Sequence, residues 1–204
     1  MTEQPTKLST EEQILEAAQA VFLEKGLAGA RMQEIADRAG INKALLHYYF
    51  RSKEKLSALI IERAISVILP RVMAVLDTDL ELFDKIRLVV DTYLTFVSRN
   101  SFLPLFIVNE VNRNPHFFFR AVVEKERTHL DKFRRQVDEA VAQGRIHPIS
   151  SAQLFMNVMS LVIFPFLGKP IIQAGLGLSE EDFKREMENR RTEVAEFVIR
   201  AIRA

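Results

Sequence analysis

The sequence predicts an all-α protein, and three observations carry that prediction. Apolar residues recur at helical spacing along nearly all of the 204-residue chain. No stretch alternates apolar and polar residues around an Asn-Gly or Asp-Gly turn, the pattern typical of a β-hairpin. Gly, Pro and Asn separate the helical stretches at intervals that suit short connections. We therefore expect a bundle of helices without a sheet.

Three short helices are expected at the N-terminal end of the chain. Thr10 and Gln13 have the spacing of a capping box, so the first helix should begin at Thr10 and end at Gly26. Two further helices are expected over about residues 31–39 and 43–49. Gly40 supplies the left-handed residue that stops the first of these, and Asn42 caps the second. The two helices should therefore meet across a tight turn.

Longer helices are expected in the rest of the chain. Their ranges are 53–76, 79–99, 102–113, 115–143, 150–175 and 179–203. Pro70 should kink the first of them, and Pro165 and Pro170 should bend or interrupt the fifth. Phenylalanine is concentrated in this part, because only Phe22 and Phe50 of the 15 precede residue 80. This shift in composition indicates two parts with different tasks.

Composition and charge limit the possible functions. Lys and Arg number 28 against 27 for Asp and Glu, so only a local basic cluster can serve nucleic acid. The chain has no Cys, which excludes disulfides, thiolate metal sites and a Cys nucleophile. The first 13 residues are polar and lack the apolar segment of a signal peptide. We expect a cytoplasmic protein.

One uncharged stretch, residues 150–168, approaches the length of a membrane span. Ser, Gln and Asn stand among its apolar residues and favour a buried helix instead. We therefore expect no contact with a membrane.

The segment IADRAGINKALLHYYF, residues 35–50, has the pattern of two helices packed across a turn. Five apolar residues are spaced to form a small core, which leaves the start of the second helix facing outward: Ile35, Ala36, Ala39, Ile41 and Leu46. Residues 31–55 carry six basic and three acidic side chains, a local net charge of +3. A basic stretch at this place favours a helix-turn-helix that binds DNA. An ordinary helical hairpin with a solvated, charged face has the same spacing.

Residues 14–56, ILEAAQAVFLEKGLAGARMQEIADRAGINKALLHYYFRSKEKL, resemble the DNA-binding domain of the TetR family of bacterial transcriptional regulators. The resemblance rests on an Ala-Ala-x-x-x-Phe-x-x-x-Gly helix, an Ile-Ala-x-x-Ala-Gly turn, an aromatic-rich third helix and a closing Ser-Lys-Glu-x-Leu. It implies a three-helix DNA-binding domain over residues 1–52 and a helical ligand-binding and dimerisation domain over residues 53–204. It further implies a homodimeric repressor that leaves a palindromic operator when a small, largely apolar effector binds.

The resemblance also assigns DNA contacts to individual side chains. Gln33 and Lys43 should reach base edges, with Ala44 and Leu45 lying against the bases in the major groove. Contacts to phosphates or to the groove wall are expected from His47, Tyr48, Tyr49 and Lys53. The positions that depart from the family pattern are Arg31, a charge in place of a hydroxyl cap, Leu45, suited to a thymine methyl, and His47, in place of Tyr. For Tyr48 and Tyr49, packing against the first helix is the alternative.

The last two predicted helices are candidates for a dimer interface. The final helix carries an apolar stripe at roughly heptad spacing, and the helix before it is apolar on nearly every side. A helix of this kind must be covered all round, which an interface of two helices from each subunit would achieve. Alternatively, both helices are core of one subunit. The candidate interface residues are Leu154, Val158, Leu161, Val162, Phe183, Met187, Val194, Phe197, Val198 and Ala201.

The Phe-rich helices between these ends allow two interpretations. They can form a dense core, or, as the family resemblance implies, they can surround a cavity for the effector. The candidate apolar walls are Ile65, Leu69, Phe102, Phe106, Phe118, Val122, Phe155, Met159 and Ile163. The candidate polar anchors are Asn109, Glu110 and Arg120.

The sequence shows no convincing catalytic constellation. Glu126 and His129 form a Glu-x-x-His pair of the kind that builds di-iron bundles, but the chain has no second pair. It also has no His-Glu-x-x-His, phosphate loop or Gly-x-Ser-x-Gly. A helical adaptor that binds another protein through its hairpin is the remaining alternative. We expect no enzyme activity, metal site or cofactor, and as partners double-stranded operator DNA, a small-molecule effector and a second copy of the chain.

Overall fold

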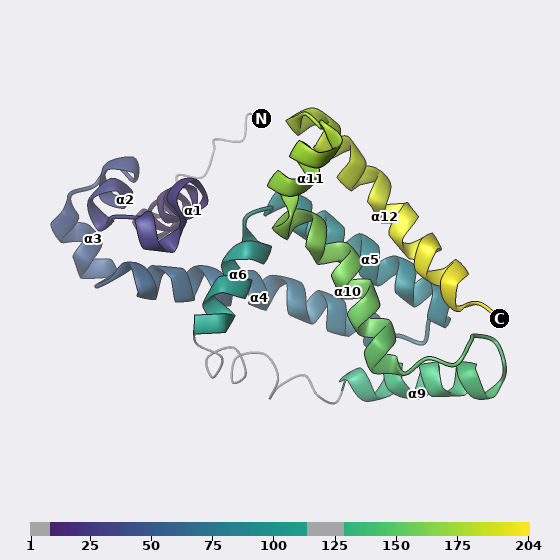
Figure 1. Ribbon diagram of the computed structural model, residues 1–204. Coiled ribbons are helices and arrows are strands. Elements are labelled where there is room, and N and C mark those ends of the chain that lie inside the picture. The colour runs from purple at the N-terminus through teal and green to yellow at the C-terminus, as the bar shows by residue number, and fades with distance from the viewer. Residues whose placement is uncertain (1–8, 114–128) are drawn as a thin grey trace, which may run out of the picture. The chain divides into compact units, whose positions relative to one another are not determined.

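The computed structural model describes residues 9–113 and 129–204. Within these ranges the chain is helical, apart from an isolated antiparallel bridge between Ile146 and Arg203, and this confirms the predicted all-α fold. The helices are α1 (Thr10–Gly29), α2 (Met32–Arg38), α3 (Lys43–Tyr49), α4 (Lys53–Asp77), α5 (Leu82–Arg99), α6 (Leu103–Arg113), α9 (His129–Ala142), α10 (Ser151–Leu167), α11 (Lys169–Leu176) and α12 (Glu180–Ile202) (Figure 1).

The chain divides into two compact units, residues 1–64 and residues 65–204. The division falls inside α4, so this one helix begins in the first unit and continues into the second. The sequence-based boundary between residues 52 and 53 falls at the start of the same helix and stays a prediction.

The N-terminus of α1 is capped one residue earlier than predicted. The Ser9 hydroxyl accepts a hydrogen bond from the backbone N–H of Glu12, and Glu12 Oε2 accepts one from the Ser9 backbone N–H at 2.8 Å. The predicted Thr10–Gln13 box is wrong, because two adjacent hydroxyl residues each have a suitable partner three positions later and the helix uses the charged one. Gly26, with a φ of 65°, interrupts the helix at its predicted end.

The turn between α2 and α3 has the predicted construction. Gly40 has a φ of 68°, in the left-handed region that glycine adopts without strain. Asn42 Oδ1 accepts a hydrogen bond from the backbone N–H of Leu45 at 2.7 Å and so caps α3. The side chains buried completely in this unit include Ile14, Ala18, Ile35, Ala36, Leu46 and Leu56. Both turn signals are therefore confirmed, and of the predicted core Ile35, Ala36 and Leu46 are buried, whereas Ala39 and Ile41 are only half-buried.

The second unit is built around α5 and α12, which pack side by side, while α10 contacts both (Figure 1). Apolar side chains of these helices, α9 and the C-terminal part of α4 form one core. Two ion pairs join α5 to α12, from Arg87 to Glu196 at 2.7 Å and from Arg191 to Asp91 at 2.6 Å. These pairs fix the register of the two helices at the edge of the core.

The helix predicted over residues 150–175 is two helices in the structure. α10 ends at Leu167 and α11 begins at Lys169, with Gly168 between them. Pro165 lies inside α10, whereas Pro170 occupies the first turn of α11, where a missing N–H is tolerated. Of the helix predicted over residues 115–143, His129–Ala142 lies within the described residues.

The strongly apolar α10 buries only one of its sides within its own chain. Leu154, Val158 and Val162 belong to the core. On other sides Phe164 is 58% exposed and Met156 is 49% exposed. Among the described residues no single helix is long and apolar enough to cross a membrane, and α10 with α11 reaches that length only as a pair bent by 74°.

Candidate DNA-reading surface, effector cavity and dimer surface

The outward side of α3 combines basic, apolar and aromatic side chains. Lys43, Ala44 and Leu45 are exposed on its first turn, while Leu46 is fully buried beneath them. Asn42 holds this turn in place, so the three exposed side chains project from a capped helix end. The result is a short helix whose inner side is fixed by the core and whose outer side is free to contact a partner.

Tyrosine side chains extend this surface at the end of α3. Tyr48 is 84% exposed, so the alternative that it packs against the first helix is wrong, whereas Tyr49 is 42% exposed and for it the alternative stays open. Their rings meet edge to face, with centroids 5.6 Å apart and planes at 89°. His47 is exposed as well. These phenol and imidazole groups can donate hydrogen bonds to phosphate oxygens.

At the start of α2 the expected loss of a hydroxyl cap is visible. Arg31 occupies the N-cap position, is exposed and makes no capping hydrogen bond through its side chain. Gln33 is exposed, and its Nε2 donates to Asp37 Oδ1 at 2.8 Å along the same helix. A base contact by Gln33 would therefore require this bond to be exchanged.

Lys53 has a structural role that sequence reasoning missed. Its Nζ donates to the backbone oxygens of Ala28 and Ala30, each at 3.0 Å, and thereby ties the start of α4 to the end of α1. Two of its three N–H donors are used in this way. The expected phosphate contact of Lys53 stays a prediction that must use the third donor or replace one of these bonds.

The positive charge of the first unit remains concentrated near α3. Lys25 pairs with Glu34 at 2.9 Å, and Arg38 pairs with Glu24 at 2.6 Å, so these charges largely neutralise one another. In the part of the chain that the structure describes, no ion pair is recorded for Lys43, Arg51 or Lys55. This arrangement leaves a basic surface around an apolar and aromatic helix end.

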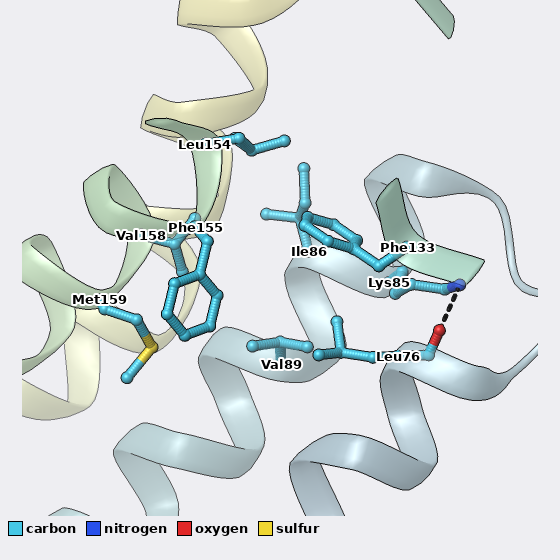
Figure 2. A pocket seen from close by; sticks show the side chains of 9 residues that line it. All are labelled: Leu76, Lys85, Ile86, Val89, Phe133, Leu154, Phe155, Val158 and Met159. Carbon is cyan, nitrogen blue, oxygen red and sulfur yellow. Dashed lines mark hydrogen bonds between the residues drawn. The ribbon is translucent and has the colours of Figure 1, made fainter. Parts of the chain in front are cut away.

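A small apolar cavity lies within the second unit, between α4, α5, α9 and α10 (Figure 2). Its volume is about 20 Å³, which is room for about one water molecule. The lining is apolar apart from one lysine and consists of Leu76, Lys85, Ile86, Val89, Phe133, Leu154, Phe155, Val158 and Met159. An apolar space of this size would have to enlarge before it could hold an effector.

Two of the predicted effector residues, Phe155 and Met159, line this cavity. Five described candidates lie elsewhere in the unit: Ile65, Leu69, Phe102, Phe106 and Ile163. The rings of Phe102 and Phe106 lie against each other, with centroids 6.2 Å apart, and Asn109 is exposed. Phe118, Arg120 and Val122 lie outside the described residues, as does the side chain of Glu110.

Lys85 is the polar residue of the cavity and was not predicted. Only 1% of it is exposed, and its Nζ turns away from the cavity to donate to Leu76 O at 2.9 Å and Thr78 O at 3.0 Å (Figure 2). Its aliphatic stem lines the cavity while its ammonium caps the C-terminal end of α4. Burial lowers the pKa of Lys85, and the nearby Lys132 ammonium lowers it further. The carboxylates of Asp77 and Asp79 raise this pKa and offset part of the decrease.

The predicted dimer residues fall into two groups. Seven are buried in the core of their own chain: Leu154, Val158, Val162, Phe183, Met187, Val194 and Val198. The other three, Leu161, Phe197 and Ala201, line an open hollow of about 280 Å³ between α10 and α12. Phe197 is 60% exposed there. Helical spacing identified the apolar stripe correctly. Most of the stripe is buried within its own chain, and only a part of it remains exposed for a partner.

Metal ligands do not gather in the part of the chain that the structure describes. No group of three or more His, Asp or Glu side chains is arranged there to hold an ion. Of the Glu-x-x-His pair, Glu126 lies outside the described residues.

The N-terminal region matches a known protein family. Residues 14–60 match the family described as bacterial regulatory proteins, tetR family. The transcriptional activator FasR of Mycolicibacterium smegmatis is 34% identical over 89 residues, which cover 44% of this chain and 41% of FasR. Residues 14–60 of this chain therefore form a domain of the TetR family, and the chain resembles regulators of that family. Members of this family are regulators of transcription and not enzymes.

Other proteins match this chain over a shorter region or in fold. The transcriptional repressor NicS of Pseudomonas putida is 42% identical over 53 residues, 26% of this chain and 25% of NicS. The chain thus spans less than half the length of FasR and about a quarter of NicS in these matches. The ketosteroid transcriptional regulator KstR2 of Mycobacterium tuberculosis has the same fold, with a TM-score of 0.73 at 16% identity over 98% of this chain and 97% of KstR2.

Proposed function

We propose that the protein is a cytoplasmic, homodimeric transcriptional repressor that binds a palindromic operator and leaves it when a small, largely apolar effector binds. The observation that carries this proposal is the outer side of α3, where Lys43, Leu45 and Tyr48 project from a helix whose inner side is fixed by Leu46. A helix-turn-helix of the TetR family with such a surface is suited to the major groove of DNA.

The proposed contacts follow from the chemistry of each side chain. Lys43 is a donor that suits guanine O6 and N7 or a phosphate, and Leu45 offers apolar contact to a thymine methyl. Ala44 is small enough to let the helix approach the bases closely. Arg31, His47, Tyr48 and Tyr49 supply donors for phosphates on the rims of the groove. Gln33 adds an amide that can bind adenine once it leaves Asp37.

A second copy of the chain is the proposed partner at the surface formed by α10 and α12. The exposed aromatic side chain of Phe197 and the open hollow beside it are complementary in character, so one copy can place Phe197 in the hollow of the other. An interface in which the same surface serves both copies has two-fold symmetry. A two-fold protein reads a palindrome whose half-sites are about 34–36 Å apart or a multiple of that distance.

We further propose that effector binding is transmitted through α4. This helix is continuous from the unit that carries α3 to the wall of the apolar cavity at Leu76. An effector that enlarges the cavity must displace Leu76 or its neighbours, and this displacement shifts the end of α4. In the dimer, a shift of α4 changes the distance between the two α3 helices. The DNA duplex fixes the distance at which both can enter the major groove, so this change lowers operator affinity.

The test is selection of DNA from a random-sequence pool by the purified full-length protein, followed by titration of the selected duplex at several salt concentrations. We expect a two-fold symmetric consensus, and we expect affinity to fall steeply with salt because Lys and Arg displace counterions from phosphates. Recovery of no consensus, together with salt-insensitive binding, would contradict a DNA-binding function and favour the helical adaptor. A consensus without two-fold symmetry would support DNA binding but refute binding as a symmetric dimer.

A further inference from the structure

An open hollow of about 350 Å³ lies where the end of α5 meets the start of α11 and the first turns of α12. This volume is within the roughly 300–1,000 Å³ range of small-molecule sites. The hollow has an apolar floor made by Phe166, Phe183 and Met187, each of which is buried. The two phenylalanine rings meet edge to face, with centroids 6.4 Å apart. An aromatic floor of this kind favours a flat, apolar ligand body.

The rim of the hollow has an excess of positive charge. Four basic and two acidic side chains line it. Lys169 pairs with Glu180 at 2.7 Å, which neutralises one charge of each sign. Arg185 and Glu188 have partners outside the hollow, namely Asp182 and Arg191.

Two further cations lie on this rim. They are Arg99, at the end of α5, and Lys184, on α12. Among the described residues neither forms an ion pair, although Lys184 is close enough to Glu180 to lower the pKa of that carboxyl. A ligand in this hollow therefore meets Arg99, which pairs with no carboxylate of the described residues, and Lys184, which Glu180 neutralises only in part.

A buried hydroxyl lies beside these cations. Ser98, which lines the hollow, has an Oγ that is inaccessible to solvent and makes no hydrogen bond. Because solvent does not reach this Oγ, a ligand in the hollow does not reach it either, and the polar partners left for a ligand are Arg99 on α5 and Lys184 on α12.

We propose that this hollow binds a small aromatic carboxylate. Its ring would lie on Phe166 and Phe183, and its carboxylate would accept hydrogen bonds from Arg99 and Lys184. The hollow is separate from the cavity between α4, α5, α9 and α10. The proposal requires neither DNA binding nor the effector mechanism described above.

The probe is para-fluorobenzoate, titrated into the full-length protein and followed by fluorine NMR. Its neutral matched probe is para-fluorobenzamide. We expect the carboxylate to bind at millimolar concentration and the amide to bind about tenfold more weakly, because hydrogen bonds to charged groups are worth about 1.5–3 kcal/mol. Equal binding of the two probes, or no binding of the carboxylate to the wild-type protein, would overturn the proposal.

Variants place the binding in the hollow. Arg99→Gln and Lys184→Gln should each weaken para-fluorobenzoate binding about tenfold, whereas Ser98→Ala, which removes a hydroxyl that solvent does not reach, should leave it unchanged. Arg200→Gln is the matched control, because it removes one exposed positive charge from α12 away from the hollow. Unchanged affinity in both test variants, or an equal loss in Arg200→Gln, would show non-specific attraction and refute the site. Thermal melts establish that each variant is folded.

Discussion

Arg190 of α12 donates a hydrogen bond from Nη2 to the backbone oxygen of Leu161 in α10 at 2.7 Å. Four residues after Leu161 stands Pro165, which has no N–H with which to complete the helical bond to that oxygen. The neighbouring helix therefore supplies the donor that the proline removes. Burial lowers the pKa of the Arg190 guanidinium, and the bond to Leu161 compensates part of that desolvation. The proline and the arginine thus fasten α10 to α12.

This relationship predicts an energetic coupling between Arg190 and Pro165. Arg190→Met should lower the free energy of unfolding by about 1–3 kcal/mol, because it leaves the Leu161 oxygen without a donor. In a Pro165→Ala background the alanine N–H restores the helical bond, so the same substitution should have a smaller effect. Urea unfolding of the four proteins in this double-mutant cycle measures the coupling. Additive effects would mean that Pro165 is not the reason for the contact.

Lys43→Ala should weaken operator binding without altering the fold. Lys43 is exposed, so its removal should change the free energy of unfolding by no more than about 0.5 kcal/mol. Loss of one good base contact should reduce affinity by about 1–3 kcal/mol and relax the preference at one position of the operator. Fluorescence anisotropy with the operator and with single-base variants measures both. Lys55→Ala is the control for loss of charge. If Lys43→Ala weakens binding equally for the operator and for every single-base variant, Lys43 contacts a phosphate and not a base.

Phe197→Glu should produce a folded monomer with weak operator binding. Phe197 is 60% exposed, so a charge there does not enter the core of the chain. Val198 is only 4% exposed, and a charge at that position would unfold the unit, which makes it unsuitable for the same test. Light scattering and operator titration measure assembly and binding. Ile171→Glu, at an exposed position of α11, should leave both unchanged, and a dimeric Phe197→Glu protein would exclude the proposed surface.

Stability should fall in acid, partly because of the ion pairs between α5 and α12. The hydrogen bond from Arg87 lowers the pKa of Glu196 below its usual value of 4.5. A carboxyl with a lower pKa in the folded state stabilises the fold above its unfolded pKa, and this contribution disappears as the pH falls through the folded value. Glu196→Gln should therefore lose less stability than wild type between neutral pH and pH values below about 4.5.

Melting temperatures followed by circular dichroism across this range measure the effect. Both partners are partly exposed, so the difference should be small and should shrink at high salt. Glu193→Gln is the control on the same helix, since no ion pair is recorded for Glu193 among the described residues. A pH profile of Glu196→Gln that is identical to wild type would mean that the pair contributes nothing to stability.

Features that depend on a few neighbouring residues could be predicted from the sequence. The Gly40 turn and the Asn42 cap follow from backbone conformation and one hydrogen bond, and both are present. The choice of Ser9 over Thr10 as the first cap could not be predicted, because both have a partner at the right spacing. Local chemistry limits where a helix begins to within a residue or so.

Features that depend on packing could not be predicted. Helical spacing shows that a side of α12 is apolar, but not that Val198 is covered by its own chain while Phe197 is exposed. Lys85 occupies an apolar position of α5, and nothing in its sequence context indicates that its ammonium reaches the end of α4. The cavity is formed by four helices that are distant in sequence, so only two of its lining residues were among the candidates.

Effector and operator should each weaken the binding of the other. A compound that co-purifies with the native protein, or that is found by screening, should bind more weakly to the operator-bound protein than to the free protein. Linkage requires that the operator lose affinity by the same factor when the compound is bound, typically about 1–3 kcal/mol. Two titrations of the compound, with and without operator, measure that factor. Met159→Trp adds more volume than the apolar cavity offers, so it should act as the effector does, abolishing compound binding and weakening operator binding, whereas Met156→Trp, on an exposed part of α10, should change neither. Equal affinity of the compound in the presence and absence of operator would mean that no coupling exists, and release through α4 would have to be abandoned.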